Sequence, residues 1–152
     1  MQENVTKLEL LSVAHIGVVV RDIDETMAHL STLLGMGPWT KLDYASTADQ
    51  MVVGEPFQLK IAGAQMGQLG IELLQPVDSP NSVWAQHLKH HGEGLHHTAC
   101  RISNLDSAMA QLKEQGGEIL VAASPAPEMN WCYAKTAQGG LVLELMDFDL
   151  GL

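Results

Sequence analysis

Apolar residues along this chain follow two periods, and the period changes at regular places. Residues 12–20 form a valine-rich run that predicts a buried strand. The next apolar residues keep helical spacing: Ile23, Met27, Leu30 and Leu34. Asp22 and Glu25 match a helix cap with its capping-box partner, and Gly35 is suited to end the helix.

Three more strands are expected in the first half of the chain. They cover residues 39–45, 57–64 and 69–77. A polar connection that contains Gly54 and Pro56 joins the first two of them. We therefore predict one module of β-α-β-β-β order over about residues 12–77.

The same order of elements recurs after a predicted linker helix at residues 79–92. The second module covers about residues 94–147, and its helix runs from a cap at Asn104 to Gly116. Its expected strands are residues 94–102, 118–124, 130–137 and 141–147. The chain 1–152 is therefore expected to be a single α+β domain. Two tandem β-α-β-β-β modules would form a cupped mixed or antiparallel sheet with the helices on the outside.

The two modules also match residue by residue. When His15 is aligned with His97, residues 15–30 and 97–112 run in step without a gap, at a constant spacing of 82 residues (97 − 15). Each module then ends in a similar strand with one glutamate: Ile71-Glu72-Leu73-Leu74 and Leu143-Glu144-Leu145-Met146. The chain is therefore a duplicated unit in which each copy has an early histidine and a late glutamate.

Side chains alternate across a strand, so the last predicted strand has two distinct faces. One face is an apolar row that should lie under the helices: Leu141, Leu143 and Leu145. Glu144 then points to the concave side of the sheet, and the symmetry of the repeat places His15, Glu72 and His97 there as well. The same alternation places His96 on the helix side, where we interpret it as a structural residue.

Two imidazoles and two carboxylates on neighbouring strands are typical of a metal site. A single buried histidine is often a core residue, and a single glutamate can lie in solvent at a sheet edge. Burying an unpaired carboxylate is costly, however, and here it happens twice at equivalent positions. We therefore predict that His15, Glu72, His97 and Glu144 bind a divalent ion such as Zn, Co, Ni, Mn or Fe(II). An octahedral shell would leave room for a substrate to chelate.

Composition and charge narrow the range of partners. The 152 residues are 46% hydrophobic and 17% charged, which is typical of a globular domain. The net charge is −10, and the eight lysine and arginine residues are scattered along the chain. A nucleic-acid surface needs clustered cations, so no nucleic-acid partner is expected.

Two further features bear on the compartment. No run reaches 18 apolar residues, and residues 1–11 lack the features of a signal peptide. Cys100 and Cys132 lie in strand-like runs, which favours buried thiols in a reducing compartment. We expect a cytoplasmic protein without a membrane partner, and exposed sheet edges make a homodimer the expected assembly.

Four motifs resemble those of the vicinal oxygen chelate superfamily. They are Ala14-His15-Ile16-Gly17, Ile71-Glu72-Leu73-Leu74-Gln75-Pro76, Gly94-Leu95-His96-His97 and Leu143-Glu144-Leu145. The superfamily includes glyoxalase I, methylmalonyl-CoA epimerase, extradiol dioxygenases and resistance proteins. The resemblance spans about residues 13–148 and is greatest, in its middle section, to methylmalonyl-CoA epimerase. It implies a cup of paired modules around a divalent metal, with these two histidines and two glutamates as its ligands.

The resemblance also implies a reaction. A metal-dependent epimerase or isomerase would remove a proton alpha to the carbonyl of a small acyl-thioester or 2-oxo substrate. Glu144 is our candidate general base, and Glu72 is its symmetric partner for the opposite face of the carbon. Two departures separate the chain from the epimerases: Gln58 stands nearest the place where some of them have a catalytic carboxylate, and residues 134–138 lack a His-Pro pair.

Four residues are candidates for substrate binding. Arg101 shares the predicted face of His97 and could bind a substrate carboxylate with two hydrogen bonds. Lys60 and Gln58 lie on the third predicted strand, where Lys60 could donate a proton. Trp131 could line the cup.

Other functions fit the same four ligands. One is a lyase of the glyoxalase I type that acts on a glutathione hemithioacetal. A ring-cleaving dioxygenase is less compatible, because its iron has two histidine ligands and one glutamate ligand, and Glu72 would take up an open position. From a different class, the protein could bind and sequester a small molecule, as resistance proteins of this superfamily do.

Overall fold

A computed structural model describes residues 7–149 and contains three α-helices and nine strands within that range. In chain order the elements are β1 (Leu10–Val19), α1 (Ile23–Leu34), β2 (Thr40–Ala45), the 3-10 helix η1 (Ala48–Gln50), β3 (Met51–Val53), β4 (Gln58–Met66), β5 (Leu69–Val77), α2 (Val83–His91), β6 (Gly94–Ile102), α3 (Leu105–Glu114), β7 (Glu118–Ala126), β8 (Met129–Lys135) and β9 (Val142–Met146). The predicted alternation of strands and helices is confirmed.

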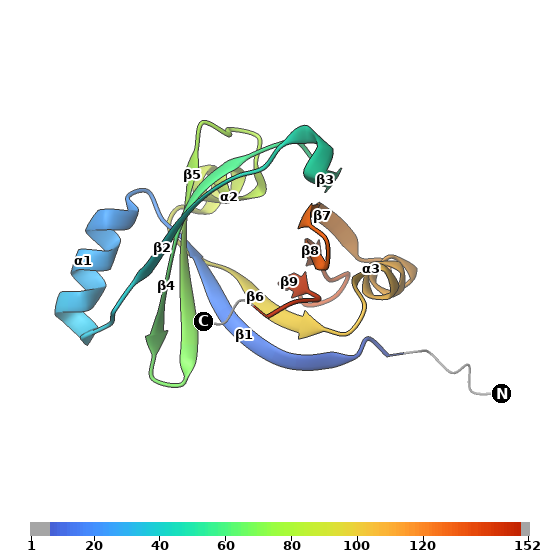
Figure 1. Cartoon of the computed structure of the whole chain (residues 1–152), viewed down its shortest axis with the longest axis horizontal. Coiled ribbons are helices and arrows are strands. Elements are labelled where there is room, and N and C mark those ends of the chain that lie inside the picture. Colours follow the sequence, from blue (N-terminus) through green and yellow to red (C-terminus); the bar gives the residue numbers. More distant parts are fainter. Residues whose placement is uncertain (1–6, 150–152) are drawn as a thin grey trace.

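All nine strands between residues 7 and 149 form one curled sheet (Figure 1) in the order β2-β4-β5-β1-β6-β9-β8-β7-β3. Each module has its first and last strands parallel, β1 with β5 and β6 with β9. The modules join through an antiparallel pair at the centre of the sheet, β1 with β6. The predicted fold class of two tandem modules in a cupped mixed sheet is therefore confirmed.

The polar connection after β2 forms a strap between the two modules. The chain leaves β2 at one edge of the sheet, passes through η1 and adds β3 to β7 at the other edge. Figure 1 shows this segment crossing the top of the open side of the sheet. From the sequence we predicted only a connection here, because a strand of three residues, such as β3, is too short to show a recognisable alternation.

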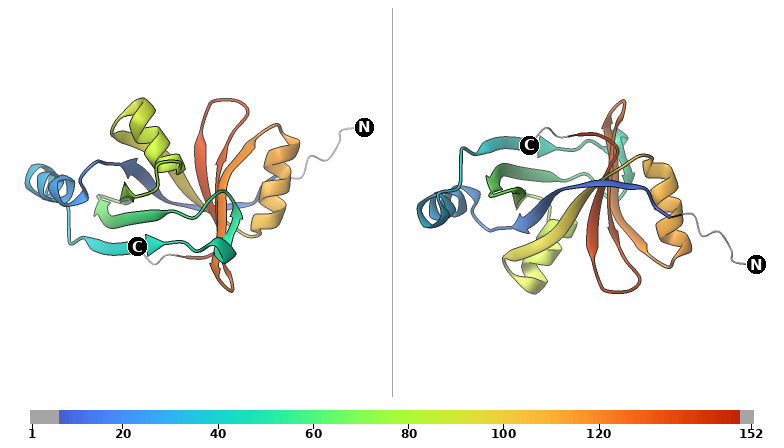
Figure 2. Two further views of the ribbon diagram at one scale, coloured as in Figure 1. Left: turned by 90° about the horizontal axis from the view of Figure 1, so that it is seen from above. Right: turned by 90° about the horizontal axis from the view of Figure 1, so that it is seen from below.

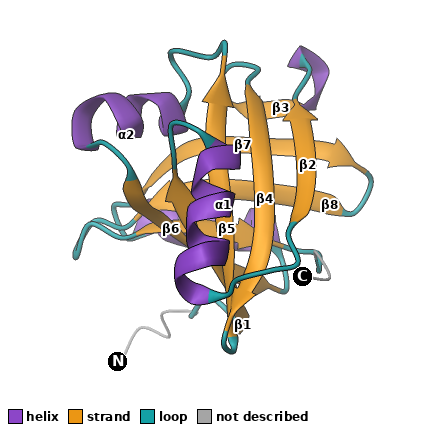
Figure 3. Ribbon diagram, turned by 90° about the vertical axis from the view of Figure 1, so that its left-hand side faces the viewer, coloured by secondary structure: helices purple, strands orange, loops and turns teal. Residues whose placement is uncertain are grey.

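Helices α1 and α3 cover the convex face of their own modules, as predicted. Figure 2 shows them at opposite ends of the molecule, and Figure 3 shows α1 lying across β4 and β5. Ile23 and Met27 of α1 pack on Ala62 and Leu73 of the sheet. The caps are also as expected, since Asp22 accepts a hydrogen bond from the backbone of Glu25, as Asn104 does from that of Ser107.

Helix α2 differs from the prediction in its start and in its role. It begins at Val83 with Ser82 as its cap, not near Ser79. Ser79 instead holds the preceding turn, where its hydroxyl donates to the carbonyl of Val77 and accepts from the backbone of Gln58. Trp84 is buried among residues of the concave side of the sheet, so α2 contributes to the interior of the cup.

The predicted apolar row on the last strand is confirmed for two of its three members. Leu143 and Leu145 pack with Leu105 and Ala108 of α3. Leu141 is 57% exposed and lies before the strand begins at Val142. Glycines 139 and 140 both have positive φ and turn the chain just before this point, which delays the strand.

Cys100 and Cys132 are buried free thiols, as expected. Burial raises the pKa of the Cys132 thiol to about 12, which keeps it protonated and unreactive. Within residues 7–149, no helix is both long and apolar enough to cross a membrane.

The packing of the core leads to a prediction about the stability of two leucine variants. Leu73 of β5 is completely buried between α1 and the sheet, so Leu73→Ala should lower the free energy of unfolding by about 2–5 kcal/mol. Leu95, which is 70% exposed, provides the matched control, and Leu95→Ala should change it by less than about 0.5 kcal/mol. Urea denaturation of both variants measures the difference, and equal effects would contradict this packing.

Candidate metal centre

Four buried polar side chains meet at the centre of the sheet. His15 lies on β1, Glu72 on β5, His97 on β6 and Glu144 on β9, which are four neighbouring strands. Each side chain is buried, with no more than 8% of any residue exposed. The parallel pairing within each module brings the last strand beside the first, so the glutamate of each copy lies next to a histidine. The structure thus brings together all four predicted ligands.

The donor atoms of these side chains face a common point. His15 Nε2 lies 3.0 Å from Glu72 Oε2 and 3.3 Å from Glu144 Oε2, and His97 Nε2 lies 3.6 Å and 3.1 Å from the same two oxygens. None of these four atoms has a partner with hydrogen-bond geometry among the described residues. Ligands about 2.1 Å from one ion stand about 3.0–3.4 Å apart. The donor set therefore fits a divalent ion, and all four atoms lie within 4.8 Å of one another.

The charges in this cluster are strongly coupled. Burial acts to lower the pKa of His15, but contacts with the Glu144 and Glu72 carboxylates outweigh it and raise the pKa to about 10. The pKa of His97 is raised for the same reasons. Burial would raise the pKa of Glu144, yet the two imidazoles lower it to about 2. An incoming metal ion must therefore displace imidazole protons.

Gly17 makes the position of His97 possible. The two residues are paired across β1 and β6, and a Cβ on Gly17 would lie 1.9 Å from Cε1 of the His97 ring. This overlap could be relieved only if the His97 ring, a candidate metal ligand, moved. The glycine in the motif Ala14-His15-Ile16-Gly17 is therefore explained by the second histidine, 80 residues away (97 − 17).

His96 lies against His97, contrary to our prediction that it faces the helix side. The pairing of β6 with β1 steps from His97 opposite Gly17 to Leu95 opposite Val18, so His96 is an extra residue in the strand. Such a β-bulge interrupts the alternation of side chains. His96 Nδ1 consequently lies 3.1 Å from His97 Nδ1.

A neutral His96 ring can fix the orientation of the His97 ring. Burial and the charges of His97 and His87 lower the pKa of His96 to about 3, so its ring stays neutral and can accept a hydrogen bond. His97 can then donate from Nδ1 and keep Nε2 for a metal ion. Ligating histidines commonly have their second nitrogen fixed in this way.

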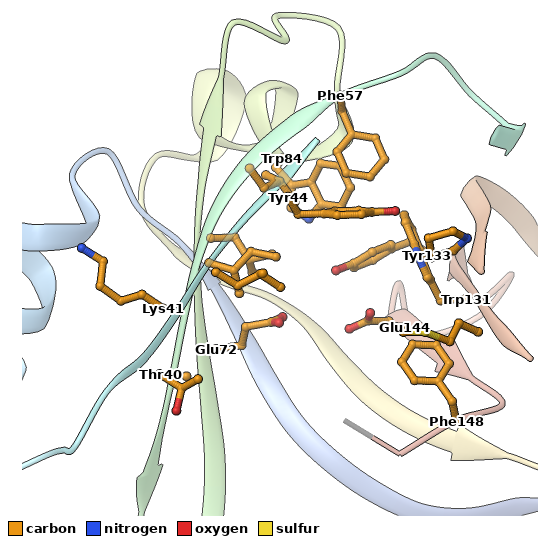
Figure 4. Close-up of a pocket in the computed structure, with 17 residues that line it drawn as sticks. Thr40, Lys41, Tyr44, Phe57, Glu72, Trp84, Trp131, Tyr133, Glu144 and Phe148 are labelled. Carbon is orange, nitrogen blue, oxygen red and sulfur yellow. The ribbon is translucent and has the colours of Figure 1, made fainter. Parts of the chain in front are cut away.

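A cavity of about 400 Å³ opens beside the four ligands. Figure 4 shows the carboxylates of Glu72 and Glu144 pointing toward each other from opposite walls. The lining is mostly apolar and comes from both modules, the strap and α2: Thr40, Lys41, Leu42, Tyr44, Phe57, Leu59, Ile61, Gly63, Glu72, Leu74, Trp84, Pro125, Met129, Trp131, Tyr133, Glu144 and Phe148. This volume is within the range of small-molecule sites.

Of the four residues predicted to bind substrate, one lines the cavity and three do not. Trp131 lines the cavity as predicted. Gln58 and Lys60 do not, because Leu59 and Ile61 of the same strand face inward and alternation turns their neighbours outward. Arg101 lies outside the lining too, with Nη1 3.7 Å from Asp149. These three residues lie outside this cavity, and a role for them in substrate binding stays a prediction.

Phe57 and Trp84 line the cavity although nothing in the sequence indicated it, whereas Tyr133, like Trp131, could be expected there. Phe57 and Trp84 are separated by 27 residues in the chain (84 − 57), yet their ring centroids lie 4.7 Å apart. Tyr133 packs at 4.7 Å, edge to face, on the His97 ring. Burial together with the nearby Glu144 and Glu72 charges raises the pKa of Tyr133 well above its ordinary value, so its hydroxyl keeps its proton. Strand alternation can indicate Tyr133, which lies two residues after Trp131 on β8, but it cannot indicate Trp84, which lies on α2.

Comparison with protein families gives the affiliation of the chain. Residues 14–136 match the model of the glyoxalase/bleomycin resistance protein/dioxygenase superfamily. The chain belongs to this superfamily. The predicted resemblance is thereby confirmed, and the buried cluster fits the divalent metal site of superfamily enzymes. A search of curated protein sequences finds no significant match.

Several solved structures share the fold. The methylmalonyl-CoA epimerase of Mycobacterium tuberculosis is 25% identical, with a TM-score of 0.66 over 95% of this chain and 92% of that one. A hypothetical protein of Bacillus halodurans is 22% identical, with a TM-score of 0.65 over 93% and 96% of the two chains. A Streptomyces coelicolor epimerase variant bound to 2-nitronate-propionyl-CoA is 18% identical, with a TM-score of 0.64 over 92% and 97%.

The metal centre predicts stoichiometric binding that weakens in acid. The purified protein should take up about one divalent ion per chain, and His97→Ala should lose it. Because the pKa of His15 is raised to about 10, its ring is protonated below that pH, and the ion must displace the proton. Affinity should therefore fall as the pH is lowered from 9 to 6. Calorimetric titration in buffers of different ionisation enthalpy measures the released protons; a pH-independent affinity would contradict the assignment.

The contact of His96 with His97 predicts a graded loss of metal affinity. His96→Ala removes the acceptor that fixes the His97 ring, and should weaken metal binding by about 10–100-fold. His90→Ala is the matched control, since His90 is exposed on α2 and contacts Gln86. Competition with a chromogenic chelator measures both constants. Equal affinities for the two variants would show that His96 has no such role.

Proposed function

We propose that the protein is a metal-dependent epimerase or isomerase that moves a proton at a carbon alpha to a carbonyl. The substrate class is a small acyl thioester or 2-oxo compound. A divalent ion held by His15, Glu72, His97 and Glu144 would stabilise negative charge on the substrate oxygen, which makes the alpha proton removable near neutral pH.

One observation carries this proposal. Among the described residues that line the cavity, Glu72 and Glu144 are the only carboxylates, and both also belong to the metal centre. They face each other from strands β5 and β9, on opposite walls (Figure 4). A substrate carbon between them would have one carboxylate on each side.

Two opposed carboxylates suffice for a balanced proton transfer. Glu144 as general base would take the proton when the C–H bond breaks and release it to solvent, and Glu72 would pass a proton from solvent to the opposite face of the carbon. The carbon is thereby inverted, and no proton is gained or lost overall. Return of the proton by Glu144 to the adjacent carbon would give an isomerisation instead. Tyr133 beside Glu144 keeps its own proton and can donate a hydrogen bond to substrate.

The similar structures support the substrate class. Several of them are described as methylmalonyl-CoA epimerases; one from Streptomyces coelicolor is in complex with 2-nitronate-propionyl-CoA, and another epimerase is in complex with methylmalonyl-CoA. The two candidate ligands are the only carboxylates among the described lining residues, which supports one of them as the base. The expectations of a homodimer and of a cytoplasmic location remain predictions.

Solvent exchange tests the proposal. Metal-loaded protein in D₂O should incorporate deuterium at the alpha carbon of one member of a panel that includes methylmalonyl-CoA, 2-oxo acids and a glutathione hemithioacetal. Glu144→Gln should slow this exchange by at least about 100-fold. Glu118→Gln, at an exposed glutamate of β7, is the control.

Metal content must be measured on each variant, so that loss of the base is distinguished from loss of the ion. Exchange at the normal rate in a metal-loaded Glu144→Gln protein would remove Glu144 from the mechanism. A metal-loaded wild type that binds the panel but exchanges no proton would indicate a binding protein instead.

A further inference from the structure

The cavity beside the metal centre gathers nearly all the aromatic rings of the protein. The chain has two Phe, three Trp and two Tyr residues, and all of them except Trp39 line this cavity. We define five of them as the aromatic cluster: Tyr44, Phe57, Trp84, Trp131 and Tyr133. Successive rings of the cluster lie 4.7–5.7 Å apart, mostly edge to face. Another ring in contact with them would find the same geometry.

In the described part of the chain, no unpaired lysine or arginine side chain lines the cavity. Lys41 is the only lysine or arginine among the described lining residues, and its Nζ lies 2.6 Å from Asp24 on α1. Figure 4 shows the Lys41 side chain directed away from the two carboxylates. A second negative group on the substrate, beyond the one that chelates the metal, would be buried without a partner at a high cost.

Two buried polar atoms belong to the aromatic cluster. Trp84 Nε1 and Tyr44 Oη are closed off from water and make no hydrogen bond of standard geometry within residues 7–149. Trp84 is 1% exposed and packs against Phe57 and Tyr133. The aromatic cluster is therefore both part of the hydrophobic core and part of the cavity wall.

We propose that the substrate of this site carries an uncharged aryl group. Two adjacent oxygens of the substrate would lie at the metal centre, and the ring would lie against the aromatic cluster. This inference rests on the proposed function, because it takes the metal centre as the anchor of the reacting end. It separates the protein from enzymes that act on small aliphatic or dicarboxylic acyl groups.

A set of ligands with one chelating group and different side groups tests the inference. Phenylpyruvate, pyruvate and 2-oxoglutarate are all 2-oxo acids, but carry an aryl group, a hydrogen and a second carboxylate, respectively. Calorimetric titration of the metal-loaded protein should give phenylpyruvate an affinity at least tenfold higher than that of either of the others. Equal affinities, or tighter binding of 2-oxoglutarate, would overturn the inference.

Matched tryptophan variants locate the ring. Trp131→Leu should lower the affinity for phenylpyruvate at least tenfold and leave that for pyruvate within twofold. Trp39→Leu changes the remaining aromatic residue outside the cavity and should alter neither constant. If Trp131→Leu does not fold, as judged by thermal denaturation, Phe148→Ala at the partly buried end of the cavity provides the same comparison.

The binding measurement and the deuterium-exchange measurement test the two proposals separately. Preferential aryl binding without deuterium exchange would support the ring site and overturn the proposed reaction. Exchange on methylmalonyl-CoA without any aryl preference would overturn the ring site and support the reaction.

Discussion

The structure depends on the burial of four polar atoms that have no hydrogen-bond partners. Two imidazole nitrogens and two carboxylate oxygens meet at the centre of the only sheet described. In a low-dielectric interior such groups destabilise a fold by several kcal/mol unless a charge compensates them. A divalent cation would do so, and three surrounding features suit such a site: the missing side chain of Gly17, the bulge at His96 and the alignment of four central strands.

Duplication of one module explains why the centre is symmetric while the cavity is not. Each copy supplies one histidine and one glutamate from its first and last strands, so a bound ion would lie between two equivalent halves. The cavity wall lacks this symmetry. Tyr44 and Phe57 come from the first module, Trp131 and Tyr133 from the second, and Trp84 from the helix between them. The ligands thus determine the kind of chemistry, whereas the unrepeated positions determine what fits beside it.

The sequence predicted the four ligands because two copies of one pattern can be compared. A single Glu72 or His97 would have been ambiguous, but the repeat supplied a second observation at each position. It could not place His96, since a bulge depends on how β1 and β6 pair and leaves no local signal. Lys60 is a different case. Leu59 and Ile61 flank it in the strand, and this apolar alternation already indicated in the sequence that Lys60 points away from the concave face.

A shared fold does not determine the substrate, and the reason is physical. At 25% identity or less, the strands that hold the metal can superpose while most side chains of the cavity differ. Hydrophobic contacts of the wall favour a ring only weakly through any one residue, so selectivity must come from several rings together. A second carboxylate is disfavoured more strongly, because Lys41, the one cation among the described lining residues, is paired with Asp24, and the other charged side chains there are the carboxylates of Glu72 and Glu144. Exclusion of charge, more than attraction of the ring, is therefore the stronger determinant of what this cavity accepts.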